Sequence, residues 1–507
     1  MSRITGASAV LTHPFWSGFL NRTGFTADSG AVPCPRRLPT ALKVVATCVL
    51  LAGCFGGPVP APGPGPAPSP DPSPSPAPPP SPSPWKPTTF GIGVSAQPPE
   101  LGPSGWLAQT GVPFGYAYQY LAAGVNTGNG WQTWNDKAQF PLWYARDAAA
   151  RGALPVFPYY MLRQSIGPCD ACGEAEQDLA HLDSPGLMAT YYADFAKLMQ
   201  RLGPGTHDGV DGYGGDAVVH VEPDLSGYAQ QAVRNAPSCY GHCTGTGNDP
   251  NLLRTSVASS GYAPVAGYPN TWRGFNLALL HLRDLYAPNV KLAFHVSSWT
   301  TGRDIGSDTD PALDPVAHGN LAGSFAVASG VGSATTGTSN YDMVFNDVAD
   351  RDAGYYKYVL NQPNRFWDRL NVTFPNFRRW EEFVGAVTET TGRKMVVWQI
   401  PLGNQWSRSV SNSDDHYQDN RAEYFFGHVD ELVDVGVVAL LFGRGNDGST
   451  SHTDAHGDGV TNPASFCTTD GVSSGQVCNT TASTVTDDDG GYLRQAATTY
   501  YAAPVTL

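Results

Sequence analysis

Charge is scarce in this sequence, and positive charge is the scarcer kind. Asp, Glu, Lys and Arg make up 15% of the 507 residues, and 30 Lys plus Arg stand against 44 Asp plus Glu, which leaves a net charge of −14. Proteins that bind nucleic acid or an anionic membrane surface need the opposite balance, so we expect no nucleic-acid partner. Apolar residues make up 41% and aromatic residues 11%, which is enough for a large core and excludes global disorder.

Motifs of two enzyme classes are also missing. No GxGxxG or phosphate-binding GxxxxGK pattern follows the first apolar run after residue 88, which argues against nucleotide binding. No GxSxG pattern stands at the end of a predicted strand, because the match at 471–475 follows a polar stretch, and this argues against an esterase of the α/β-hydrolase type.

The N-terminal part has the features of an export signal. Residues 1–53 carry a net charge of +4, whereas the remainder carries −18. The ten-residue apolar run 44–53 is too short to span a bilayer and has the length of a signal-peptide core. Leu-Ala-Gly-Cys at 51–54 resembles the lipobox of bacterial lipoproteins, which implies lipidation of Cys54. Cleavage nearby without a lipid is the alternative, and a start codon downstream of residue 1 stays open.

A proline-rich segment, 54–85, follows the signal. It has 15 prolines within 58–84, a composition typical of extended polyproline II. At ~3.1 Å per residue this stretch extends about 80 Å. We expect a tether that holds one folded domain, 86–507, at the cell surface or outside the cell, with the membrane contacted only through the lipid.

Six cysteines of the predicted domain form three pairs that are close in sequence. These are Cys169 with Cys172, Cys239 with Cys243, and Cys467 with Cys478. Zinc binding, or a redox role for the CxxC pair, is the alternative. Because the chain is predicted to be exported, we expect three local disulfides.

Eight short apolar runs predict buried strands, at 90–96, 114–121, 154–160, 217–222, 291–297, 341–347, 394–400 and 437–442. Most are continuous rather than alternating, as in strands covered on both faces. Amphipathic stretches at 142–151, 186–202, 272–286, 377–391, 424–435 and 492–503 predict helices between and after them. This order predicts a (β/α)8 barrel with long strand-to-helix loops, with an open doubly wound sheet as the alternative.

The fourth predicted strand ends in His-Val-Glu-Pro-Asp at 220–224. A carboxylate at this position lies where (β/α)8 barrels carry their chemistry. The pattern resembles the (β/α)8 glycoside hydrolases, many of which have an acid/base Glu at the end of strand four, often before Pro. The resemblance implies that Glu222 is a general acid, although Val221 stands where those families commonly have Asn. A structural Glu paired with a basic residue is the alternative.

A second resemblance concerns the same strand. Val-Glu-Pro-Asp-Leu at 221–225 is similar to the EPD strand of a cellobiohydrolase and endoglucanase family with a distorted barrel. Pro-Asn-Val at 288–290 and Asp-Arg-Asp at 350–352 match further motifs of that family, but its DRD triplet precedes the EPD strand. This resemblance points to a glucan as substrate.

Three acids follow the sixth predicted strand. Asp347, Asp350 and Asp352 lie within six residues, so they repel one another unless some are protonated, paired or bound to metal. We expect Asp347 or Asp350 to act as base or nucleophile opposite Glu222, because glycoside cleavage needs two carboxyl groups. A solvated acidic turn, with Arg351 neutralising one acid, is the alternative.

The seventh predicted strand carries Gln399 where retaining barrel glycosidases usually have a nucleophilic Glu. A glutamine can orient a sugar or a water molecule but cannot attack an anomeric carbon. This departure argues against the common retaining arrangement. The chain is then expected to be an inverting enzyme, or a retaining enzyme whose nucleophile lies on strand six.

Further strand-end residues are expected to contact sugar rings through aromatic faces or hydrogen bonds. These predicted substrate contacts are Gln119, Tyr160, Asp224, His295, Trp299, Asp352, Trp398, Gln399 and Asp447. Any single aromatic residue or histidine among them could instead belong to the core. A His-x-Asp-x-His-x-Asp run at 452–458 could ligate a cation, but we interpret it as a solvated loop.

Together these patterns predict a secreted or surface-anchored glycoside hydrolase that cleaves a polysaccharide without a cofactor or a metal ion. The alternative is a non-catalytic glycan-binding lipoprotein on a degenerate barrel.

Overall fold

The structure is a computed structural model that describes residues 87–332, 340–358, 360–402, 419–443 and 490–507. The predicted signal and tether, Cys54, Asp447, the run 452–458 and the Cys467/Cys478 pair lie outside the described residues.

Eight parallel strands form a closed barrel in which each strand pairs with its neighbours in chain order and the last pairs with the first. The (β/α)8 prediction is therefore confirmed, and the open sheet is excluded. The barrel strands are β1 (Gly91–Ser95), β2 (Tyr116–Tyr118), β3 (Leu154–Tyr159), β6 (Ala217–Val221), β7 (Val290–His295), β8 (Met343–Asp347), β9 (Met395–Ile400) and β10 (Val437–Phe442). A separate antiparallel pair, β4 (Thr206–His207) and β5 (Val210–Asp211), was not expected.

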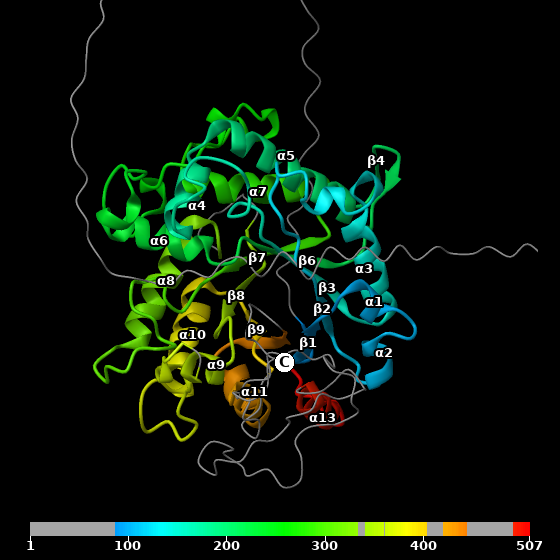
Figure 1. The fold of residues 1–507 in the computed structure, drawn as a ribbon, viewed down its shortest axis with the longest axis vertical. Coiled ribbons are helices and arrows are strands. Elements are labelled where there is room, and N and C mark those ends of the chain that lie inside the picture. Colours follow the sequence, from blue (N-terminus) through cyan, green and yellow to red (C-terminus); the bar gives the residue numbers. More distant parts are fainter. Residues whose placement is uncertain (1–86, 333–339, 359, 403–418, 444–489) are drawn as a thin grey trace, which may run out of the picture. The chain divides into compact units, whose positions relative to one another are not determined.

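Helices follow the strands and surround the barrel, with α8 beside α10 (Figure 1). Their bounds are α1 (Pro98–Leu101), α2 (Trp106–Thr110), α3 (Phe140–Ala150), α4 (Glu174–Leu182), α5 (Pro185–Leu202), α6 (Leu225–Arg234), α7 (Trp272–Tyr286), α8 (Pro315–Ser329), α9 (Ala353–Tyr358), α10 (Phe377–Thr391), α11 (Arg421–Gly427), α12 (Val429–Asp434) and α13 (Gly490–Tyr501). The single helix predicted at 424–435 is wrong, because His428 leaves the helical conformation and separates α11 from α12.

Several helices begin after a residue whose side chain accepts a hydrogen bond from a backbone N–H of the first helical turn. Thr271 caps α7, Asp314 caps α8 and Asn376 caps α10, each by accepting a hydrogen bond from the N–H three residues further on. Such caps satisfy donors that the first helical turn leaves without a partner.

The core has two layers because side chains of a strand point alternately to its two faces. An inner cluster fills the barrel with residues such as Tyr118, Val218, Phe345 and Trp398. A larger cluster lies between the strands and the helices and includes Val219 of the same strand as Val218. Strands buried on both faces explain the continuous apolar runs of the sequence.

Two of the three predicted disulfides are confirmed, Cys169–Cys172 and Cys239–Cys243. Within the described ranges, no helix combines the length and the apolar character needed to cross a bilayer.

Candidate active site

The carboxyl ends of three neighbouring strands bring two acids and a histidine together. Asp224 follows β6, His295 ends β7 and Asp347 ends β8. The His295 Nε2 atom lies 3.2 Å from Asp347 Oδ1 and 3.8 Å from Asp224 Oδ1. Because β6, β7 and β8 are adjacent in the barrel, their ends meet at the face where (β/α)8 proteins carry their sites.

A second histidine holds the ring of His295 from inside the barrel. His220 Nε2 lies 3.0 Å from His295 Nδ1, and the ring of His220 packs against Phe345 and Trp398. Complete burial lowers the pKa of His220 well below its usual value, and the neighbouring His295 lowers it further. His220 is therefore a neutral partner that fixes the orientation of His295.

Asp224 is the last residue of the β6–α6 connection and precedes the first residue of α6, and its φ of +71° turns the chain sharply. Its carboxylate accepts a hydrogen bond from the Ser297 hydroxyl at 3.3 Å. Although 39% of the side-chain surface is exposed, burial raises the pKa of Asp224 well above its usual value, and Asp347, Glu174 and Asp350 raise it further. This carboxyl group therefore tends to keep its proton.

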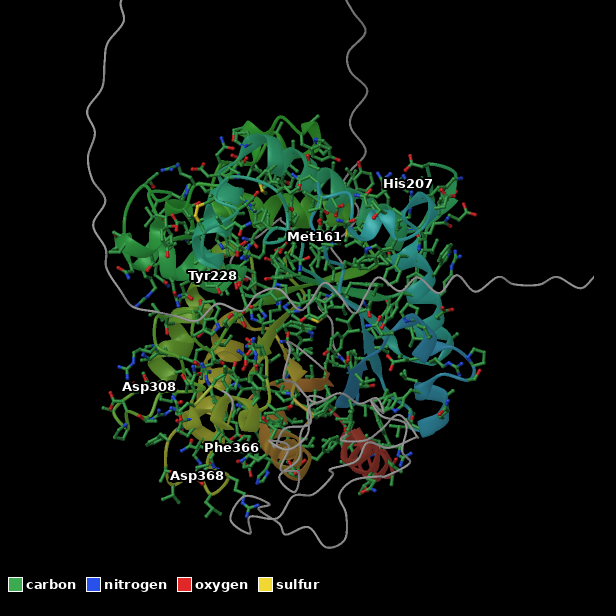
Figure 2. All side chains as sticks on the ribbon, in the orientation of Figure 1. Met161, His207, Tyr228, Asp308, Phe366 and Asp368 are labelled. Atoms are coloured by element: carbon green, nitrogen blue, oxygen red, sulfur yellow. A yellow bond between two sulfur atoms is a disulfide. The ribbon has the colours of Figure 1, made fainter. Side chains whose placement is uncertain are left out.

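Glu222 lines a small buried cavity together with His295, but its carboxylate makes hydrogen bonds to other residues. It is 2% exposed, and its carboxylate accepts hydrogen bonds from the backbone N–H groups of Met161 and Leu162. Met161 lies near the middle of the side-chain view (Figure 2). Burial raises the pKa of Glu222 to about 8, although Tyr191 of α5 and the two N–H groups oppose the shift.

The backbone explains this position. Strand alternation would direct Glu222 to the same side as His220, but its φ of +38° breaks the alternation. The side chain therefore faces the connection after β3 and the helix α5. The expected pairing of Glu222 with the acids of strand six is not what these contacts support.

The other acids after β8 have different surroundings. Asp350 pairs with Arg351 at 2.8 Å and accepts a hydrogen bond from the Tyr356 hydroxyl, with 38% of its side-chain surface exposed. Asp352 is fully buried, which corrects its assignment as a substrate contact, because a buried carboxylate has no surface to offer a sugar.

The predicted sugar contacts divide into buried and accessible side chains. Gln119, Trp398 and Gln399 are buried, and Gln399 accepts a hydrogen bond from the Tyr120 hydroxyl at 2.7 Å. Tyr160 is partly exposed and donates a hydrogen bond to Glu174 at 2.8 Å.

Trp299 and Tyr228 form an aromatic pair, with ring centroids 4.8 Å apart and both residues partly exposed. Of the predicted platform residues, Trp299 and Tyr160 are thus accessible, whereas Trp398 belongs to the inner core of the barrel. Its burial corrects the assignment of Trp398 as a sugar platform.

Two acids of α4 were missed from the sequence. Glu174 and Asp178 act electrostatically on Tyr160 and Asp224, and burial together with Glu174 raises the pKa of Asp178 well above its usual value. The acidic start of this helix after the Cys169–Cys172 loop was the available signal.

Two groups of side chains in the described residues have the separations that a metal ion requires. Asp224, His295 and Asp347 offer ligand atoms within 4.8 Å of one another, and so do Cys169, Cys172 and Glu176. The cysteines of the second group form a disulfide, so they offer no thiolate.

No family model and no curated protein matches the sequence. Among solved structures, an endo-β-1,4-mannanase from Cellulomonas fimi aligns with a TM-score of 0.39 and 10% identity over 72% of this chain and 67% of the mannanase chain. A Bacteroidetes-affiliated GH5 cellulase aligns with a TM-score of 0.38 and 10% identity, covering 72% and 86% of the two chains. An intracellular xylanase from Thermoanaerobacterium saccharolyticum aligns with a TM-score of 0.33 and 11% identity, covering 70% and 85%. These glycoside hydrolases are similar to this chain in fold.

Proposed function

We propose that this chain hydrolyses glycosidic bonds in a polysaccharide. The observation that carries the proposal is the pair of carboxylates, Asp224 and Asp347, at the carboxyl end of a closed (β/α)8 barrel. Glycosidases divide acid and base or nucleophile roles between two such groups. Partly exposed aromatic side chains near Asp224, such as Tyr228, suit the apolar face of a sugar ring.

The separation of the two carboxylates favours a retaining mechanism. Their ligand oxygens lie within 4.8 Å of each other. Retaining glycosidases place their carboxyl groups about 5–5.5 Å apart, whereas inverting enzymes leave about 6.5–9.5 Å for a water molecule. A nucleophile on strand six also agrees with the glutamine on strand seven.

The exposure of the two side chains suggests their roles. Asp224 is more exposed, with 39% of its side-chain surface accessible against 19% for Asp347. We assign Asp224 as the acid that protonates the leaving oxygen and then activates water, and Asp347 as the nucleophile that forms the glycosyl ester. Asp350, held by Arg351 and Tyr356, is assigned to the binding of sugar hydroxyl groups.

Polysaccharide hydrolysis can be tested with purified residues 86–507 on neutral and amino-sugar polysaccharides, with reducing ends as the readout. Asp224→Asn and Asp347→Asn should each lower kcat by about 10²-fold or more, and Asp350→Asn should mainly raise KM. Asp208→Asn, a surface acid paired with Lys197, is the control that should keep full activity. Binding of a glycan without release of reducing ends would instead support the glycan-binding lipoprotein.

Export and lipid anchoring complete the proposal. The apolar run 44–53, the lipobox-like 51–54 and the proline-rich segment 54–85 support a mature protein that begins at a lipidated Cys54. Mass spectrometry of the mature N-terminus tests this. A Cys54→Ala protein that still incorporates palmitate would contradict it.

A further inference from the structure

We infer that Asp224, His295 and Asp347 form a binding site for a divalent transition-metal ion of the Zn²⁺ type. Zn²⁺ lies about 2.0–2.2 Å from nitrogen and carboxylate oxygen ligands, so its ligands in a tetrahedron are about 3.4 Å apart. The two separations measured from His295 Nε2, 3.2 Å and 3.8 Å, lie on either side of that value.

The histidine provides an independent observation. His295 is 1% exposed, and neither its Nε2 atom nor Asp347 Oδ1 has a hydrogen-bond partner among the described residues. The two atoms are 3.2 Å apart, yet they are not aligned for a hydrogen bond. A buried ring nitrogen aimed at carboxylate oxygens without a hydrogen bond leaves both groups unsatisfied, and a cation between them would satisfy both.

The surroundings of the ligands resemble the outer shell of a metal site. Metal-binding histidines usually hold their second ring nitrogen in a hydrogen bond, which fixes the ring. Here the second nitrogen, His295 Nδ1, lies 3.0 Å from His220 Nε2. Ser297 likewise donates to the Asp224 carboxylate.

The ligand set selects the class of ion. Imidazole nitrogen favours transition metals, whereas Ca²⁺ takes six to eight oxygen ligands. Three protein ligands leave a fourth tetrahedral position for water or a substrate oxygen. We therefore expect Zn²⁺ and Co²⁺ to bind and Ca²⁺ to bind far more weakly.

The consequence for activity rests on the proposed function. An ion held by Asp224 and Asp347 occupies both carboxylates that are proposed to cleave the glycosidic bond. Zn²⁺ should therefore inhibit hydrolysis in proportion to its occupancy of the site, and chelation should restore the rate.

The test uses the metal-free protein under non-reducing conditions, which keeps the Cys169–Cys172 disulfide intact. Titration with Co²⁺ should produce the visible absorption of a low-symmetry four-coordinate ion, and calorimetry with Zn²⁺ should give the affinity. Asp224→Asn and Asp347→Asn should each weaken Zn²⁺ binding about 100-fold or more, since even outer-shell changes cost about 10–100-fold. His220→Gln should weaken it by about 10–100-fold for that reason, and Asp208→Asn is the matched control.

The outcomes separate the two ideas. No Co²⁺ band, equal affinity of wild type and the Asp224→Asn and Asp347→Asn variants, or Ca²⁺ binding as tight as Zn²⁺ would overturn the inference. Circular dichroism shows whether a variant is folded, and the partly exposed Asp224 can be changed without disturbing a buried core. Co²⁺ binding that depends on Asp224, in a protein that cleaves no polysaccharide, would sustain the metal site and refute the glycosidase.

Discussion

The carboxyl group of Glu222 should make the stability of the protein fall as the pH rises. Burial raises its pKa from an ordinary 4.5 to about 8 in the folded state. Between these two values the folded protein holds a proton that the unfolded chain has released, so the free energy of unfolding decreases with increasing pH. At pH 7 the loss is about 3 kcal/mol, because one pKa unit corresponds to about 1.4 kcal/mol.

The substitution Glu222→Gln removes this titration without changing the shape of the side chain. The amide oxygen of glutamine can accept the same backbone N–H groups of Met161 and Leu162 that the carboxylate accepts. The variant should be about as stable as the wild type near pH 4.5 and about 3 kcal/mol more stable at pH 7.

The measurement is urea unfolding at a series of pH values between 5 and 8, in metal-free buffer so that an ion at Asp224 does not contribute. Glu382→Gln, an exposed position on α10, is the matched control and should show the same pH dependence as the wild type. A stability difference between Glu222→Gln and wild type that stays constant across this range would refute the reasoning.

The same variant decides the catalytic role of Glu222. If Glu222 only supports the barrel wall, Glu222→Gln should keep kcat within a few-fold of the wild-type value. A decrease in kcat of about 10²-fold or more would instead show that Glu222 is the general acid, as the Glu-Pro resemblance implies.

Two further predictions concern stability. Asp342→Ala should cost about 1.5–3 kcal/mol in urea unfolding, because fully buried Arg283 would lose its ion pair with Asp342 and keep the one with Asp284; a loss below about 1 kcal/mol would contradict this. Replacing both Cys169 and Cys172 by alanine should cost about 2 kcal/mol, as expected for the closure of a very short loop, and reductant should then no longer lower the thermal midpoint through this bond.

The barrel could be predicted because each of its strands is a short apolar run that can be recognised from local composition. Strands covered by the inner core on one face and by helices on the other must be apolar on both, and such runs stand out from the loops around them. The helix α8 could not be predicted in this way. Gly319 and Gly323 lower its helix propensity, and the structure uses them for contact with α10, where a Cβ atom on Gly319 would lie 2.5 Å from the Phe383 carbonyl oxygen.

The proximity of Asp224, His295 and Asp347 could be predicted in part from the sequence. Consecutive strands of a (β/α)8 barrel are neighbours, so residues at the ends of strands four, five and six must lie close together. The distances from His295 Nε2 to Asp347 and Asp224, 3.2 and 3.8 Å, could not be predicted, because they depend on the turn after β6 and on the ring orientation that His220 imposes.

The orientation of Glu222 shows why a motif does not fix a role. The same letters, Glu-Pro-Asp, can present either carboxylate to the mouth of the barrel, depending on the dihedral angles of the strand end. A φ of +38° at Glu222 and of +71° at Asp224 directs the first side chain into the wall and leaves the second partly exposed beside Asp347. Gln399 at the end of β9 has a φ of +56° as well, so strict alternation fails at two of the strand ends where the resemblance placed catalytic groups. Residues with positive φ outside glycine are uncommon and concentrate at functional sites. The strand ends that we propose to carry the chemistry are therefore the positions where alternation is the poorest guide to side-chain direction.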